Sequence, residues 1–245
     1  MRIILHGASG HMGRIVRRLI DDNENMFLAA AVDVSGAEGC LPSLDAFTGE
    51  ADCVIDFSHH SATQTLLDYC IRRNLPLVLC TTGQTAEERA AIAEAGNHIP
   101  VFFSANMSPA IAMLAGMAAQ AAKMFPDADI EIIEKHHNRK LDVPSGTALL
   151  LAKSIQEVRV DSVLNIGRHE NGKRTKKEIG VHSLRMGNEV GTHEIIISTG
   201  TQTITLKHEA EDRALFAEGA IVAAEFIVSQ SAGVYAMQDM INAQN

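Results

Sequence analysis

The sequence predicts an α/β protein whose first part forms a parallel sheet and whose second part is a strand-rich α+β segment. Up to Pro109, near-continuous apolar runs alternate with segments of helical period, which is typical of a parallel sheet covered on both faces. After Pro109 this alternation gives way to longer strands. A length of 245 residues fits one large or two modest domains.

The first part alternates strictly between the two kinds of element. Apolar runs predict strands at 2–7, 26–34, 51–58, 76–82 and 99–106. Amphipathic segments between them predict helices at 11–22, 61–74 and 85–96. We expect Ser61 to cap the second helix and Thr85 to cap the third, which ends at Gly96.

The second part begins with an alanine-rich helix at 110–125, which could connect two domains. A half-exposed strand is expected at 127–137, a capped helix at 145–158, two strands within 179–199 that join at Gly187-Asn188, and a strand at 201–210. The tail at 213–230 returns to a helical period. The basic run 172–178 is expected to be an exposed loop, because isolated charge clusters are usually solvated.

Composition limits the classes of partner. A net charge of −9 and an aromatic content of 4% without Trp argue against nucleic acid. The four cysteines form no C-x-x-C pair, which suits a reduced, cytoplasmic protein. No signal-peptide pattern and no run of about 18 apolar residues is found, so we expect no membrane partner.

Three glycines follow the first strand in "GASGHMG", at Gly7, Gly10 and Gly13. Glycine lets a strand–helix turn approach a pyrophosphate, and the helix N-terminus supplies N–H donors. Asp33 stands 20 residues after Gly13, where a carboxylate could accept both ribose hydroxyls. The pattern favours dinucleotide binding; a structural turn or a mononucleotide site is the alternative.

Asp33 also bears on the choice of cofactor. Its neighbours Val34 and Ser35 offer no cation for a 2′-phosphate, and the carboxylate would repel one. The sequence therefore favours NADH over NADPH, although Arg14, Arg17 and Arg18 could still reach the pocket. Two further strand ends, "CTTG" (80–83) and "SANMS" (104–108), should line the nicotinamide side, unless "CTTG" is an ordinary turn.

The densest polar stretch is "EIIEKHHNRKLDVPSGTA", 131–148. A histidine there can supply a proton, Lys140 adds a positive charge, and "PSGT" opens a helix whose N–H groups suit a carboxylate. This combination favours an anionic substrate. Two alternatives stay open: surface histidines, and a zinc site of Glu134, His136, His182 and His193, which no H-x-x-x-H spacing supports.

Along its whole length the chain resembles the dihydrodipicolinate reductases (4-hydroxy-tetrahydrodipicolinate reductases) of lysine and diaminopimelate biosynthesis. The resemblance rests on "GASGHMG", "VIDFS", "CTTG", "SANMSPAIAM", "EIIEKHHNRKLDVPSGTAL", "VHSLRMGNEVGTHEI" and "FAEGAIVAAEFI". It implies an N-terminal Rossmann domain with a parallel sheet (1–107, with 217–245 packing back) and a C-terminal α+β domain with a mixed sheet (108–216) for substrate binding and oligomerisation.

The resemblance also implies roles for individual residues. His136 and Lys140 match the acid/base residue and the proton donor. The substrate carboxylates would meet His137, Ser145, Gly146 and Thr147. The cofactor would meet Gly7, Ala8, Ser9, Gly10, His11, Met12, Gly13, Asp33, Cys80, Thr81, Thr82, Ser104, Ala105, Asn106 and Met107. No metal is implied.

The implied activity is reduction of a small dicarboxylate by NADH, with NADPH possible, in a homotetramer. Family members that use NADPH well often have Arg in the glycine loop and a basic residue after the acid, where this chain has His11 and Val34. A regulatory protein that binds NAD(H) without catalysis is the alternative function.

Overall fold

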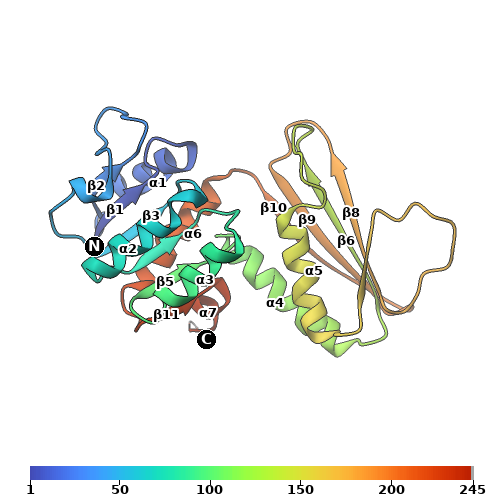
Figure 1. Cartoon of the computed structure of the whole chain (residues 1–245). Coiled ribbons are helices and arrows are strands. Elements are labelled where there is room, and N and C mark those ends of the chain that lie inside the picture. The colour runs from blue at the N-terminus through green and yellow to red at the C-terminus, as the bar shows by residue number, and fades with distance from the viewer. Residues whose placement is uncertain (244–245) are drawn as a thin grey trace. The chain divides into compact units, whose positions relative to one another are not determined.

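The structure is a computed structural model that describes residues 1–243. The chain divides into two compact units (Figure 1). Unit 1 is Met1–Ser108 together with the chain from Ala214 onward, and unit 2 is Pro109–Arg213. None of the helices within 1–243 is long and apolar enough to cross a membrane.

The described residues of unit 1 form a six-stranded parallel sheet in the order β11-β5-β4-β3-β1-β2. The strands are β1 (Arg2–His6), β2 (Phe27–Val32), β3 (Cys53–Asp56), β4 (Leu77–Leu79), β5 (Pro100–Phe103) and β11 (Gly233–Tyr235). The chain runs from β1 to β2 on one side and then crosses to β3 on the other. The carboxyl ends of β1 and β3 therefore form the switch point at which such sheets bind ligands.

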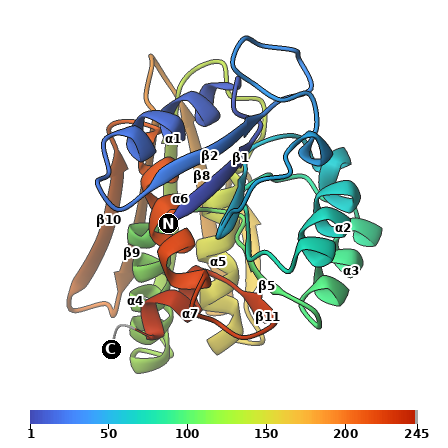
Figure 2. The same ribbon diagram turned by 90° about the vertical axis from the view of Figure 1, so that its left-hand side faces the viewer.

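Helices cover both faces of this sheet, as the continuous apolar strands predict. On one face α2 (Thr63–Arg73) packs beside α3 (Ala86–Ala95) over a core that includes Ile4, Val54 and Leu77. On the other, α1 (His11–Asp21) contacts α6 (Ala214–Ile227), whose small buried residues allow close packing. Figure 2 shows both helix pairs. The short helix α7 (Met237–Asn242) follows β11.

The described part of unit 2 is a five-stranded mixed sheet in the order β10-β9-β6-β8-β7. The strands are β6 (Asp129–His136), β7 (Val163–Ile166), β8 (Glu178–Arg185), β9 (Gly191–Ser198) and β10 (Thr203–Ala210). The helices α4 (Pro109–Met124) and α5 (Gly146–Val158) pack on one face only (Figure 1).

The rows of side chains beneath these helices change character along the sheet. Two apolar rows come first: Ile130, Ile179, Ile197 and Ile204, then Ile132, Val181, Ile195 and Leu206. The next row is polar: Glu134, Ser183, His193 and His208. The face of the sheet that packs against the helices is thus polar at one end. Buried polar side chains at that end indicate a candidate functional site.

The structure confirms the α/β class with a parallel first sheet and a mixed second one. It also corrects details. Ser61 is not the cap of α2, because His60–Ala62 form a 3₁₀ turn that runs directly into the helix. The strands on either side of Gly187-Asn188 are not paired with each other, since β6 lies between them. Short elements were missed: β7, β11 and α7.

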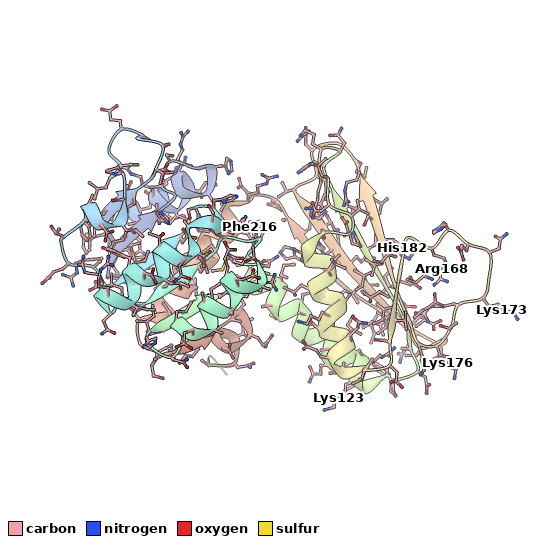
Figure 3. The ribbon with its side chains drawn as sticks, in the orientation of Figure 1. Lys123, Arg168, Lys173, Lys176, His182 and Phe216 are labelled. Atoms are coloured by element: carbon pink, nitrogen blue, oxygen red, sulfur yellow. The ribbon has the colours of Figure 1, made fainter. Side chains whose placement is uncertain are left out.

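The basic run 172–178 is mostly exposed, as predicted, and Lys173 and Lys176 point away from the sheet (Figure 3). Arg174 is the exception. It returns to β6, pairing with Asp129 and Glu131 and donating to the backbone of Ile130. This arginine therefore fastens the loop to the sheet.

Candidate functional site

The glycine loop lies at the switch point, and each of its glycines has a different surrounding. Gly7 has a φ of +78°, and a Cβ there would be 2.5 Å from the backbone oxygen of Phe57. A Cβ on Gly13 would be 2.2 Å from the oxygen of Gly7. At Gly10 the one atom within 4 Å would be the same oxygen at 3.3 Å, a tight contact, and Gly10 itself is exposed. Gly7 and Gly13 are thus needed for packing, whereas Gly10 leaves room outside the loop.

The N-terminus of α1 completes this surface. Gly10 is the N-cap and supplies no side chain to the N–H groups of the first turn, which contains His11 and Met12. No acidic residue occupies that turn. Uncapped donors and a positive helix end, reached past a glycine, fit a bound pyrophosphate.

Asp33 is held against the glycine loop. Its Oδ2 accepts from the N–H of Ser9 at 3.0 Å, and its Oδ1 accepts from the N–H of Ser35 at 2.9 Å. Partial burial opposes the charge, but the hydrogen bonds from Ser35 and Ser9 hold the pKa of Asp33 well below its usual range. A charged carboxylate therefore stands beside the loop, and the next residue, Val34, is 87% exposed.

A buried carboxylate that the sequence analysis did not name lies between the strand ends. Asp56 accepts from Thr81 Oγ1 at 2.5 Å and from Ser58 Oγ at 2.6 Å, and its Oδ1 lies 2.7 Å from His6 Nδ1. It is 1% exposed. This aspartate ties the ends of β1, β3 and β4 together. In the sequence, Asp56 could have been noticed as a charged residue inside the apolar run "VIDFS".

The two other predicted cofactor loops also follow strand ends of unit 1. In the loop after β4, Cys80 and Thr81 are buried while Thr82 is exposed. In the loop after β5, Ser104 Oγ donates to the carbonyl oxygen of Asn106 at 2.7 Å, Ala105 is exposed and Met107 is buried. Both loops thus lie at the same edge of the sheet as the glycine loop.

In unit 2 the polar end of the sheet centres on Glu134, which is fully buried on β6. Arg185 of β8 makes a bidentate pair with it, with both N···O distances 2.8 Å. His136 Nδ1 lies 2.6 Å from its Oε2. Burial opposes ionisation, but the bonds to His136 and Arg185 hold the pKa of Glu134 well below its usual range.

The helix N-terminus of α5 joins the same cluster through Ser145. Its N–H donates to Glu134 Oε1 at 3.1 Å, and its Oγ accepts from the N–H of Ala148 as the predicted cap. The Oγ also lies 3.0 Å from His193 Nε2. Burial, and after it the charge of His136, lowers the pKa of His193 to about 3, so this ring is neutral near pH 7. Gly146 and Thr147 are the first two residues of α5, and Gly146 is exposed.

The remaining predicted residues follow β6, which ends at His136. That end allows both histidines to serve, because His137 already belongs to the loop. His137 Nε2 lies 3.2 Å from Arg213, and burial and Arg139 lower the pKa of its ring. Lys140 Nζ pairs with Asp142 at 2.9 Å, and its side chain is 21% exposed.

The zinc alternative requires four residues, and the structure separates one of them, His182, from the other three. His182 lies on the face of the sheet away from α5 (Figure 3), where its Nε2 is 2.8 Å from Glu131. Glu134 is already paired with the Arg185 guanidinium. A carboxylate that is already paired with a cation is poorly suited to bind zinc as well.

The fold and the two sites define a two-domain, dinucleotide-binding α/β protein. Comparison with known proteins makes this specific. The chain belongs to the dihydrodipicolinate reductase family: residues 1–107 match the family model "Dihydrodipicolinate reductase, N-terminus", and residues 110–241 match "Dihydrodipicolinate reductase, C-terminus". The resemblance seen in the sequence is thereby confirmed.

Individual relatives agree over the full length. The chain is 40% identical to the 4-hydroxy-tetrahydrodipicolinate reductase of Caldanaerobacter subterraneus, covering 98% of each chain. It is 42% identical to that of Clostridium tetani, covering 99% of this chain and 97% of the other. The dipicolinate-bound dihydrodipicolinate reductase of a Paenisporosarcina species has a similar structure, with a TM-score of 0.83, 26% identity and 98% coverage of each chain.

Proposed function

We propose that this protein is a nicotinamide-dependent reductase that converts 4-hydroxy-tetrahydrodipicolinate to tetrahydrodipicolinate in lysine and diaminopimelate biosynthesis. The observation that carries the proposal is the match of both halves of the chain to one reductase family. The geometry supports it, since β6 ends in His136 and is followed by His137, Lys140 and the N-terminus of α5, groups that suit a dianionic substrate. Substrate hydroxyl leaves as water, and one hydride and one proton are added.

The cofactor would lie on unit 1. We assign its phosphates to the loop Gly7–Gly13, its ribose to Asp33, and its nicotinamide half to Cys80–Thr82 and Ser104–Met107. When bound, it supplies the hydride. The loops Cys80–Thr82 and Ser104–Met107 carry no charged side chain, so we assign them the holding and orienting of the nicotinamide half.

The substrate would lie against unit 2. We assign its carboxylates to His137 and to the N-terminus of α5 at Gly146 and Thr147, with Ser145 holding that helix end in place. The proton that follows the hydride comes from His136 or Lys140. Both are cationic donors when protonated, and both stand beside the proposed carboxylate site.

An assay with purified protein tests the reductase directly. We expect absorbance of the reduced cofactor to fall only when the product of dihydrodipicolinate synthase is supplied. A mixture without that product is the control. No consumption with either NADH or NADPH would contradict the reductase, and saturable NADH binding without turnover would favour the regulatory alternative.

We further propose that NADH is preferred. Asp33 is charged beside the glycine loop, and a 2′-phosphate there would meet its carboxylate without a cation at Val34. We expect kcat/KM to be about tenfold higher with NADH than with NADPH. In Asp33→Ser the ratio should fall toward one. A higher kcat/KM with NADPH in the unaltered enzyme would refute the preference.

We also propose a cytoplasmic homotetramer that assembles through unit 2. Within unit 2, α4 and α5 pack on one face of the sheet and leave the other face without a helix, and Leu184 on that face is 43% exposed. An uncovered sheet face with apolar side chains is suited to pairing with another copy.

A further inference from the structure

Glu134 is the one acidic residue in the polar row beneath α5. It is fully buried, while the two rows before it on the same face are apolar. A buried carboxylate costs stability unless it is paired and hydrogen-bonded. The hydrogen bonds and the ion pair of Glu134 therefore indicate the structural role of its charge.

Those bonds join three elements at a single carboxylate. Oε2 meets His136 Nδ1 and Arg185, and Oε1 meets Arg185 and the N–H of Ser145. Arg185 also donates to the carbonyl oxygen of Asp142 at 2.7 Å. The carboxylate thus connects β6, β8 and the N-terminus of α5.

The same bonds fix the tautomer of His136. An ionised carboxylate can only accept, so the proton of the neutral ring must lie on Nδ1. Nε2 then lies on the far side of the ring, where a Cβ at Gly191 would come within 3.0 Å of it. Glycine at 191 makes room for the ring in this orientation.

We propose, on the basis of the reductase function above, that Glu134 is a positioning residue: it holds His136 with Nδ1–H bonded and Nε2 left for proton transfer, and it fixes the N-terminus of α5 relative to that ring. Glu134 then fixes the positions of both the proton donor, His136, and the end of α5 that binds the substrate carboxylate. A shift of either would displace the substrate from the donor, and proton transfer needs hydrogen-bond distance.

Glu134 is the anion bonded directly to the His136 ring, and the Arg185 guanidinium is the cation bonded to the same carboxylate. The neutral ring of His193 lies on another side of His136, with the two ring centroids 5.2 Å apart. Of these neighbours, only Glu134 is hydrogen-bonded to His136, so it is the group that orients the ring.

The test is Glu134→Gln, which keeps the size of the side chain and removes the charge. We expect kcat to fall at least about tenfold with the KM for NADH within about twofold. A variant with the kcat of the parent would overturn the proposal.

Glu131→Gln is the matched control. Glu131 lies on the same strand and is also paired with a histidine, His182, and with the arginines Arg168 and Arg174, but on the opposite face. We expect kcat within about threefold of the parent at equal oligomeric state. Equal losses in the two variants would mean that any lost carboxylate pair on β6 has this effect, and the proposal would fall.

A measurement on the unaltered protein decides the matter even if Glu134→Gln does not fold. In protein with ¹⁵N-labelled histidine, the neutral ring of His136, identified by its absence in His136→Gln, should show a protonated Nδ1 and a bare Nε2. The opposite tautomer would overturn the proposal. Inactivity of the parent would instead contradict the reductase function, while the ring signals would still report the orientation.

Discussion

Replacing Lys140 by alanine is expected to lower kcat by about 10²–10⁴-fold while the dissociation constant for NADH changes by less than about threefold. Lys140 lies in the loop after β6, four residues beyond His136, and its side chain is largely buried with Nζ paired to Asp142 at 2.9 Å. A largely buried ammonium beside the proposed carboxylate site attracts the dianion and can donate a proton. Steady-state kinetics and a fluorescence titration with NADH separate these two quantities.

Lys135→Ala is the matched control, since Lys135 precedes His136 on β6 and alternation places it on the opposite face. We expect its kcat to stay within about threefold of the parent. A regulatory protein would keep its output in Lys140→Ala. Full turnover in that variant would remove Lys140 from the proposed chemistry and leave His136 as the donor.

Local features could be predicted from the sequence because their causes lie within a few residues. The cap of α3 is an example: Thr85 Oγ1 accepts from the N–H of Glu88, which in turn accepts from the N–H of Thr85. Ser145 caps α5 in the same local way. The predicted cap at Ser61 was wrong because Ser61 lies inside a 3₁₀ turn, which His59 caps and which leads into α2.

The centres of both sites could not be predicted in this way. Arg185 pairs with Glu134 across 51 positions of the chain, and His6 pairs with Asp56 across 50. These contacts depend on which strands become neighbours and in which register, and β6 comes to lie between β8 and β9. No periodicity within a single segment specifies that order. From the sequence, Glu134 was therefore considered only as a polar residue of the 131–148 stretch and as a ligand in the zinc alternative, and Asp56 was not considered as a site residue.

We expect two alanine substitutions in the glycine loop to have different effects on stability. In Gly13→Ala the new Cβ would be 2.2 Å from the Gly7 oxygen, so the backbone must move, and we expect the free energy of unfolding to fall by about 3 kcal/mol. In Gly10→Ala the nearest atom would be 3.3 Å away, and the φ of −66° suits alanine. We expect stability within about 1 kcal/mol of the parent.

Measurements of NADH binding distinguish the two interpretations of this loop, a phosphate-binding loop and a structural turn. If phosphates approach past Gly10, the methyl group of Gly10→Ala stands in their path, and the affinity for NADH should fall at least about tenfold in a protein that still unfolds like the parent. Gly172→Ala, in open space on the exposed loop of unit 2, should change neither quantity. Parental NADH affinity in a folded Gly10→Ala would mean that the glycines serve only the turn. A tenfold loss would mean that Gly7 and Gly13 build the loop so that Gly10 can face the cofactor.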